Sequence, residues 1–261
     1  MRAYVQQGSQ EDFNFLSLDQ TAHWFWERGY EVIRFDYPEL GAGVLDRGLR
    51  QFSEETIVAG GVGTIREALQ RAGRPLPENL DLPQCLDNWI GRRFWTSTLD
   101  EIRSLVEANA GLLPVHVKPL RHHKKFKGRV IAEFRDLIPT ADIDGEMPVL
   151  VQEVVRFASE WRASVFRGRI VHVGNYAGDP LLFPDANRMQ GALKAFVSPP
   201  VACAMDWGVT EAGETLLVEV NDAFALGAYG IRGSIYTAMI EARWRQLMGL
   251  ADNGVGEWLS M

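Results

Sequence analysis

The sequence predicts an α+β protein made of two α+β subdomains, preceded by a small α/β lobe of the Rossmann type. Two observations predict this class. Residues 1–72 alternate short apolar strands with helices, which is typical of parallel α/β layers, whereas the region from residue 113 carries successive strands with few helices. Three prolines within residues 73–83 mark a linker between the two patterns. We therefore expect three parts in chain order: residues 1–90, 91–150 and 151–261.

The first lobe is expected to begin with a short apolar strand. A helix should follow where Leu18, Ala22 and Phe25 recur near helical spacing, and Gly29 should end it. The glycine-rich turn at residues 60–63 follows another apolar strand. Such turns can cradle phosphate, but the fingerprint is incomplete, which favours a plain strand-to-helix turn. The expected elements are strand 3–5, helix 18–28, strand 31–35, strand 56–59 and helix 64–72.

The second region should begin with a helix that runs to about Ala108. Ser97 or Thr98 can cap it, with Glu101 completing a capping box. The chain should end in an amphipathic helix over residues 233–250. The strands expected between these helices are 113–118, 129–134, 149–155, 162–166 and 169–175.

Composition describes an ordinary globular protein. Of the 261 residues, 46% are hydrophobic and 23% are charged. The net charge of -7 argues against a nucleic acid or an anionic membrane as partner. The two cysteines, Cys85 and Cys203, have no metal-ligand spacing and are expected to be buried free thiols. The N-terminus lacks an apolar signal-peptide core, and no apolar run is long enough to span a bilayer, so a cytoplasmic location is expected.

The segment around Glu219 and Asn221 predicts a polar face on a β-hairpin. Side chains alternate along a strand, so these two residues point the same way. A turn about the Ala212–Gly213 bond would bring Asp206 opposite Glu219. Two carboxylates and an amide suit Mg²⁺, which takes a few such ligands and fills its other positions with water and phosphate. The spacing supports a half-exposed hairpin with solvated acids equally well.

Cations precede this hairpin in the sequence. Lys118 ends an apolar strand and can reach a ligand over the strand end, although surface lysines of this kind are common. Residues 121–129 carry five formal positive charges. They can form a solvated loop, a nucleic-acid contact or a clamp on a polyanion. A loop that closes on a nucleotide triphosphate fits best, because phosphoryl transfer needs cations to offset charge. Such a loop is expected to become ordered when the nucleotide binds.

The strand at residues 149–155 ends in Gln152 and Glu153, which are suited to line the edge of an adenine ring. Glu160 can accept hydrogen bonds from ribose hydroxyls. Arg162 offers a rigid, bidentate fork for phosphate or carboxylate. Alternatively, Glu160 and Arg162 form only a surface ion pair of little energetic value.

The order of these motifs resembles the ATP-grasp superfamily, and most closely the clade defined by one arginine and two lysines. The resemblance extends over about residues 95–232, within an expected ATP-grasp domain at 91–261. The motifs are Val117-Lys-Pro119, Lys124-Lys-Phe-Lys-Gly128, Gln152-Glu-Val-Val155, Glu160-Trp-Arg162, Asp206 followed after twelve residues by Glu219-Val-Asn221, and Gly227-Ala-Tyr-Gly230.

The resemblance implies a role for each matching residue. Lys118 and Lys124 would contact the nucleotide, with Lys125 and Lys127 as alternatives in the same loop. Arg162 and Lys124 would be catalytic. The adenine pocket would be lined by Gln152, Glu153 and Val155, the ribose would be bound by Glu160, and Mg²⁺ would be held by Asp206, Glu219 and Asn221.

The resemblance also implies an ATP- and Mg²⁺-dependent ligase. Such an enzyme joins a carboxylate to an amine through an acyl phosphate, and its substrates would be small molecules or peptides, with an amino acid as one option. A kinase that stops after phosphoryl transfer and a non-catalytic nucleotide-binding module are the alternatives. Residues 1–90 resemble the lobe that precedes this fold only in their pattern, so the sequence does not identify the substrate.

Overall fold

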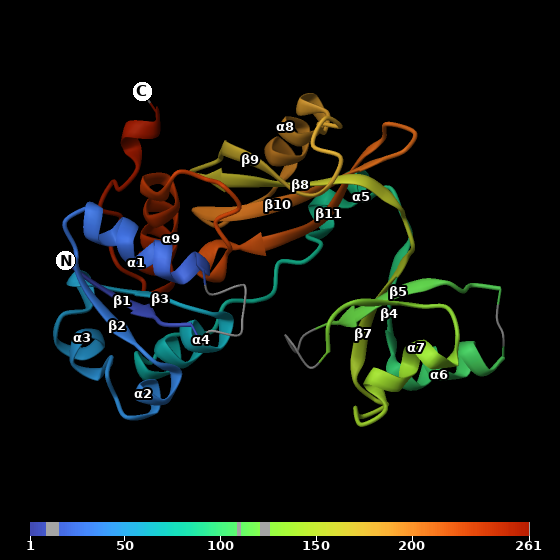
Figure 1. Cartoon of the computed structure of the whole chain (residues 1–261), viewed down its shortest axis with the longest axis horizontal. Coiled ribbons are helices and arrows are strands. Elements are labelled where there is room, and N and C mark those ends of the chain that lie inside the picture. The colour runs from blue at the N-terminus through green and yellow to red at the C-terminus, as the bar shows by residue number, and fades with distance from the viewer. Residues whose placement is uncertain (9–15, 109–110, 121–125, 261) are drawn as a thin grey trace. The chain divides into compact units, whose positions relative to one another are not determined.

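The structure, a computed structural model, describes residues 1–8, 16–108, 111–120 and 126–260. It contains two compact units (Figure 1). Met1–Trp89 and Ala158–Met261 form the first unit, and Ile90–Phe157 forms the second. Parallel and antiparallel sheets occur together with helices, which confirms the predicted α+β class with a small α/β lobe. The expected division into three parts stays a prediction.

The α/β lobe belongs to the first unit. Its elements are β1 (Arg2–Gln6), α1 (Leu16–Glu27), β2 (Glu31–Phe35), α2 (Tyr37–Gly41), α3 (Asp46–Gln51), β3 (Thr56–Ala59) and α4 (Val62–Arg71). The sheet order is β2-β1-β3, and all pairs are parallel. Helices are needed here because parallel strands can be joined only by long crossovers.

The glycine turn between β3 and α4 is held by a side chain from β1. Gln6 Oε1 accepts hydrogen bonds from Gly61 N at 2.9 Å and from Thr64 Oγ1 at 2.6 Å. The amide of Gly61 is therefore satisfied within the protein. This agrees with a plain strand-to-helix turn rather than a phosphate cradle.

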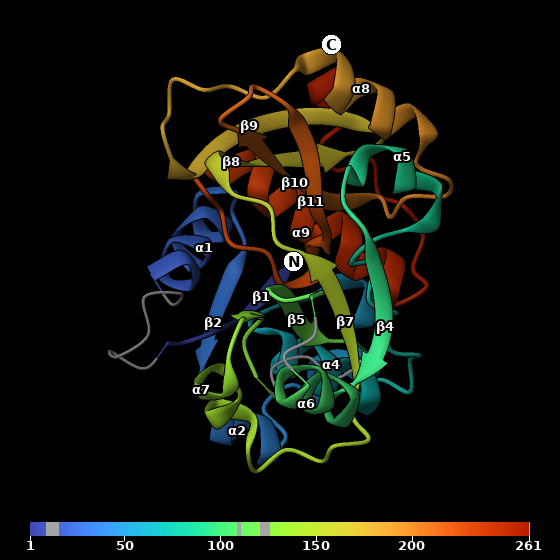
Figure 2. The same cartoon turned by 90° about the vertical axis from the view of Figure 1, so that its right-hand side faces the viewer.

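A four-stranded antiparallel sheet forms the second layer of the same unit. Its order is β11-β10-β8-β9. The strands are β8 (Phe157–Phe166), β9 (Arg169–Gly178), β10 (Ala202–Thr210) and β11 (Thr215–Asp222), and α8 (Ala186–Ala195) lies between β9 and β10 in the chain. One face of this sheet packs against α8 in a hydrophobic cluster that contains Ala163, Met205, Trp207 and Leu217. Figure 2 shows α8 and the C-terminal helix on opposite sides of the sheet.

The C-terminal helix α9 (Gly233–Leu247) contacts strands of both sheets, β3 and β10. The expected amphipathic pattern is wrong, because eight consecutive residues, 235–242, are buried. The buried Glu241 is accommodated by three donors: Arg28 Nη2 and Tyr30 Oη at 2.6 Å each, and Asn253 Nδ2 at 2.7 Å. A helix between two layers has no solvent-facing side, and a carboxylate is tolerated there only when it is fully paired.

The second unit is a four-stranded antiparallel sheet in the order β4-β7-β5-β6. Helices α6 and α7 cover one of its faces (Figure 1). The elements are β4 (Phe94–Thr98), α6 (Leu99–Glu107), β5 (Val115–Pro119), β6 (Arg129–Ile131), α7 (Phe134–Leu137) and β7 (Pro148–Glu153); the short α5 (Asp87–Ile90) precedes them. The predicted capping box is confirmed, since Thr98 Oγ1 accepts from Glu101 N and Glu101 accepts from Thr98 N.

Several predicted boundaries differ from the structure. The strand expected over 129–134 ends at Ile131, because Glu133 caps the helix that begins at Phe134. The strand expected over 162–166 begins earlier, at Phe157. Residues 73–83 form no helix, although Asp81 makes one bridge to Val220. The predicted mobile basic loop lies largely outside the described residues.

Candidate functional site

A β-hairpin brings two of the predicted metal ligands together. β10 and β11 pair with Val209 opposite Thr215, so the turn centres on Ala212, half a residue before the expected Ala212–Gly213 bond. Gly213 adopts a φ of +81° there, which suits glycine. A β-bulge then shifts the register between Asp206 and Trp207, and Asp206 lies opposite Glu219. The predicted pairing is confirmed, and the bulge makes it possible.

The bulge also sorts side chains between the two faces of the sheet. In β11, Leu217 and Val220 both belong to the hydrophobic cluster under α8 although they are three residues apart. Glu219 therefore turns to the opposite face, as Asp206 does in β10 by ordinary alternation. A bulge commonly re-aims a side chain in this way next to a functional site.

Asp206 is the centre of a hydrogen-bonded group on this face. Arg162 of β8 donates through Nε to Oδ1 at 2.7 Å and through Nη2 to Oδ2 at 2.6 Å. Asn221 Nδ2 donates to Asp206 Oδ2 and to Glu219 Oε1, at 3.0 Å each. The site's arginine, both acids and the amide are thus joined directly. We call Arg162, Asp206, Glu219 and Asn221 the arginine–acid cluster.

Burial excludes the alternative of a solvated hairpin for Asp206, whose exposed fraction is 2%. The alternative of a surface pair between Glu160 and Arg162 is also wrong, because Arg162 is buried and donates to Asp206 instead. A buried bidentate pair of this kind is held in one geometry. The convergence of Arg162 with the predicted metal ligands therefore has a defined structural basis.

Burial and the neighbouring charges have opposing effects on the pKa values within the cluster. Burial raises the pKa of Asp206; Arg162 lowers it, and the charges of Glu219 and Glu160 raise it again. Burial disfavours charged Arg162, but the hydrogen bonds and charge of Asp206 outweigh this and raise the pKa of the arginine. Asp206 thus has one cationic partner, Arg162, and is repelled by two further carboxylates, so an added cation would be electrostatically favoured.

Glu160, the predicted ribose ligand, connects to this cluster through two tyrosines. Tyr176 Oη donates to Glu160 Oε2 at 3.0 Å, and the Tyr176 ring meets the Tyr229 ring edge-on at 5.6 Å. Tyr229 lies under the guanidinium of Arg162, 4.4 Å from ring centroid to Cζ. Burial, followed by the charges of Asp206 and Glu160, raises the pKa of Tyr176, so its hydroxyl stays protonated as a donor. Neither tyrosine is marked by a sequence signal of its own, although Tyr229 lies in the Gly227–Gly230 motif.

The end of β11 is anchored to α9. Asp222 directly follows Asn221 and forms a buried ion pair with Arg243 of α9, in which Nε donates to Oδ1 at 2.7 Å. Asp222 Oδ1 also accepts from Phe224 N and caps the next turn. This double attachment restrains the strand end that carries Glu219 and Asn221.

The chemistry of the cluster fits a magnesium ion. Asp206 and Glu219 supply carboxylate oxygens and Asn221 an amide oxygen, the hard donors that Mg²⁺ prefers together with water and phosphate. Among the described residues, no group of three or more His, Cys, Asp and Glu side chains could hold a metal by itself. A magnesium ion here would therefore depend on phosphate oxygens for part of its coordination.

The second unit carries the other predicted nucleotide residues. His116 lies opposite Gln152 in the β5–β7 register, and Lys118 lies opposite Leu150. Val115, Val117, Val149 and Val151 pack into the core under α6 and α7. Since strand residues alternate, Lys118 and Gln152 share the face away from this core. Gln152 is buried, and its Oε1 accepts from Arg92 Nε at 2.8 Å.

Glu153 and Val155 are placed differently from Gln152. Glu153 points to the opposite face of β7, where it pairs with Arg93 at 2.6 Å and accepts from Arg93 N at 2.8 Å. These bonds lower the pKa of Glu153. Val155 is half-buried just after β7. Lys124 and Lys125 lie outside the described residues, whereas Lys127 is exposed.

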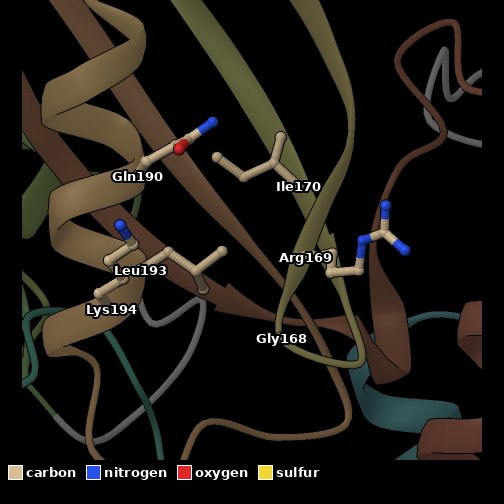
Figure 3. Close-up of a pocket in the computed structure, with 6 residues that line it drawn as sticks. All are labelled: Gly168, Arg169, Ile170, Gln190, Leu193 and Lys194. Carbon is tan, nitrogen blue, oxygen red and sulfur yellow. The ribbon is translucent and has the colours of Figure 1, made fainter. Parts of the chain in front are cut away.

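A pocket of about 340 Å³ lies elsewhere in the first unit, between the start of β9 and α8 (Figure 3). Ile170 and Leu193 line it and pack on the hydrophobic cluster under α8. That cluster lies on the face of the sheet opposite the arginine–acid cluster. Figure 3 shows the guanidinium of Arg169 directed away from α8 and from Lys194. The two cations do not converge, so this pocket is not a phosphate site.

Comparisons with known proteins agree with the fold. A protein-family model described as "ATP-grasp domain, R2K clade family 2" matches residues 89–239. A search of curated proteins gave no significant match. Within the described residues, no helix is long and apolar enough to cross a membrane.

Solved structures with a similar fold cover nearly the whole chain. D-alanine–D-alanine ligase from Bacillus anthracis, complexed with ATP, is 16% identical, with 95% of this chain and 98% of that chain covered and a TM-score of 0.51. A RimK domain ATP-grasp protein from Sphaerobacter thermophilus is 17% identical, with 94% and 99% covered and a TM-score of 0.53. The ADP complex of purK, N5-carboxyaminoimidazole ribonucleotide synthetase, is 12% identical, with 96% and 77% covered and a TM-score of 0.57. At such identities the likeness concerns the fold alone.

Proposed function

Because the chain belongs to the ATP-grasp superfamily, as a member of R2K clade family 2, we propose that it is an ATP- and Mg²⁺-dependent ligase. It joins a carboxylate to an amine through an acyl phosphate. The observation that carries this proposal is the arginine–acid cluster, in which Arg162, Asp206, Asn221 and Glu219 are linked by hydrogen bonds on one sheet face.

Asp206, Glu219 and Asn221 are the residues that would hold Mg²⁺ in this proposal. The ion supplies charge neutralisation on the phosphate oxygens when it is bound. Gln152 and Val155 would line the adenine together with the backbone of Glu153, whose carboxylate pairs with Arg93. Glu160 would bind the ribose, and Lys118 with Lys124 would contact the phosphates. The face shared by Lys118 and Gln152 supports this arrangement, and so does the hydroxyl of Tyr176, which holds the Glu160 carboxylate in place.

The chemical steps need positioning and charge stabilisation rather than a protein nucleophile. The substrate carboxylate attacks the γ-phosphorus of ATP, the bond to the β-phosphate oxygen breaks, and ADP leaves. The amine then attacks the acyl carbon, phosphate departs, and the amine loses a proton to give the amide. Arg162 is fixed beside this chemistry as a permanent cation, able to stabilise the anionic acyl phosphate.

The substrates in this proposal are small molecules or peptides, with an amino acid as one candidate, and the protein acts in the cytoplasm without nucleic acid or membrane as partner. The net charge of -7 supports the absence of polyanionic partners. A kinase on the same fold is the second candidate. It is favoured only if the acyl phosphate is released without reaction with an amine.

Two measurements test the proposal in sequence. The first is the melting temperature with ATP and Mg²⁺, with ATP and a chelator as the matched control. A ligand at about 100 times its dissociation constant stabilises the native state by about 2.7 kcal/mol, so a clear upward shift is expected only with Mg²⁺. Absence of any shift at saturating nucleotide would contradict ATP binding.

The second measurement is ADP release over a panel of carboxylates and amines, followed by mass spectrometry of the products. The ligase predicts ADP release together with an amide mass only when both substrates are present. ADP release with the carboxylate alone, with a phosphorylated product, identifies the kinase. Nucleotide binding without turnover across the whole panel supports the non-catalytic module instead.

A further inference from the structure

Tyr229 lies against the arginine of the site, although the proposed chemistry gives it no role. The Arg162 guanidinium carbon is 4.4 Å from the centroid of the Tyr229 ring. Asp206 binds the edge of the same guanidinium through Nε and Nη2. The arginine is therefore fixed in its own plane by a carboxylate and from one face by an aromatic ring.

The backbone of Tyr229 adopts a strained conformation where its ring contacts Arg162. Tyr229 adopts a φ of +45°, a region that residues with a side chain rarely occupy. Non-glycine residues stay in such conformations only when surrounding contacts enforce them, and they concentrate at functional sites. In this case the contact is a hydrogen bond from His172 of β9. Its Nε2 lies 3.0 Å from the Tyr229 carbonyl oxygen, and because a carbonyl only accepts, Nε2 is the protonated nitrogen.

A glycine makes room for the strained residue. Gly174 is the direct β9 partner of Arg162 in the β8–β9 register. A Cβ at position 174 would lie 2.4 Å from the Tyr229 carbonyl oxygen, well inside the closest distance that such atoms reach. The absence of a side chain beside Arg162 thus lets the loop after β11 approach β9. Tyr176, two residues further along β9, then meets the Tyr229 ring edge-on.

We propose that Tyr229 is a positioning residue that clamps the guanidinium of Arg162 in its bidentate contact with Asp206. The hydrogen bond from His172 and the space left at Gly174 keep Tyr229 in this position. The role of the clamp in turnover rests on the proposed ligase function. The clamp itself is a property of the protein without substrates. The aromatic ring carries the effect, and the phenol hydroxyl is not required.

The clamp is tested directly by the Arg162 Nε–H signal in the NMR spectrum of ¹⁵N-labelled protein, assigned through bonds. The Tyr229→Leu variant should move this signal downfield, because the shielding of the ring is lost. Exchange of the Nε–H with water should become about three- to thirtyfold faster, the range that a partly desolvated cation–π contact covers. Tyr229→Phe keeps the ring and should leave both quantities as in the unmodified protein.

A second variant displaces Tyr229 without removing it. Gly174→Ala should drive the Tyr229 carbonyl away and reproduce the Nε–H changes of Tyr229→Leu. Its matched control is Gly191→Ala in α8, where a Cβ finds only ordinary contacts at 3.7 Å from Trp89. An unchanged Nε–H signal and exchange rate in both Tyr229→Leu and Gly174→Ala would overturn the clamp. If Tyr229→Leu does not fold, Gly174→Ala decides alone.

Turnover separates the positioning role from the proposed function. In Tyr229→Leu, ADP release should fall about tenfold or more while the dissociation constant of ATP–Mg²⁺ changes less than about twofold, and Tyr229→Phe should restore turnover. Equal losses in binding and turnover, or no recovery in Tyr229→Phe, would overturn the positioning role. If the unmodified protein binds no nucleotide, the proposed function fails, and the NMR measurement still decides the clamp.

Discussion

Arg162 and Asp206 form a bidentate ion pair inside the first unit, with Nε–Oδ1 and Nη2–Oδ2 distances of 2.7 and 2.6 Å. The two residues are 44 positions apart in the sequence and come from different strands. Both are almost completely buried. The pair gives the site a fixed arginine and a fixed carboxylate, and its energetics lead to the first prediction.

Replacing Arg162 by Met should leave the Asp206 charge buried and uncompensated. We expect the free energy of unfolding to fall by about 3–5 kcal/mol, as found when one partner of a buried pair is removed. The Arg162→Met/Asp206→Leu double variant should recover most of that loss, because no buried charge remains. Urea unfolding followed by circular dichroism measures both values. A loss under about 1 kcal/mol in the single variant would show that solvent reaches Asp206.

Removing the charge of either predicted magnesium ligand should abolish turnover. Asp206→Asn and Glu219→Gln keep the shape of each side chain, so the fold should persist, although Asp206→Asn also removes the charge opposite Arg162 and should lower the free energy of unfolding. ADP release should fall by about 100-fold or more, because metal ions stabilise the transferring phosphoryl group by several kcal/mol. Glu211→Gln is the matched control, an exposed acid in the turn of the same hairpin. Near-normal turnover in both site variants, with unchanged circular dichroism, would refute the metal assignment.

The two thiols should differ sharply in reactivity. Cys203 is fully buried, and burial, followed by the charge of Asp222, raises the pKa of its thiol to about 12. Since the thiolate is the nucleophile, Cys203 should not react at pH 8 in the native protein. Cys85 is only partly buried. Mass spectrometry after brief iodoacetamide treatment should show one modified cysteine in native protein, at Cys85, and two in urea. Equal labelling of both cysteines without denaturant would contradict the packing of β10.

The exposed pair between Arg167 and Asp252 should contribute stability that acid removes. Arg167 lowers the pKa of Asp252 to about 2, below its unfolded value of about 3.9. Because the pKa of Asp252 is lower in the folded than in the unfolded protein, the ion pair stabilises the fold above about pH 4. This stabilisation is lost as the pH falls toward 2. The Asp252 side chain is 56% exposed, so Asp252→Asn should cost less than about 1 kcal/mol at pH 7. Its melting temperature should approach that of the unmodified protein between pH 4 and 2. A difference that grows with acid would reverse the sign and reject this account.

Sequence reasoning found elements whose signals are local. The capping box at Thr98 and Glu101 and the strand at Thr56–Ala59 occur as predicted, because caps and short apolar strands depend on nearby residues. It did not find β4 or α8. The β4 sequence, Phe94–Thr98, is rich in polar residues and pairs with β7, whose residues lie 50 to 58 positions later. It also predicted an amphipathic α9, because a single sequence does not show that two layers enclose that helix.

In the candidate site, too, only the features with local sequence signals were predicted. Strand alternation and a glycine turn predicted that Asp206 pairs with Glu219. The observed turn is centred half a residue earlier than expected, and the bulge restores this pairing. The partners of Arg162 and Glu160 could not be predicted. Asp206 takes the arginine and Tyr176 takes the glutamate, each across strands whose register no short window contains.

The fold class, the hairpin and the order of the site motifs follow from short segments of the sequence, because periodicity, turn residues and motif spacing are local properties. The burial of Asp206 against Arg162, and the packing of Tyr229 on the same guanidinium in the space left by Gly174, follow only from the tertiary structure. These contacts depend on strand register and on a loop held in a strained conformation. Both are set by the balance of packing and hydrogen bonding across distant segments.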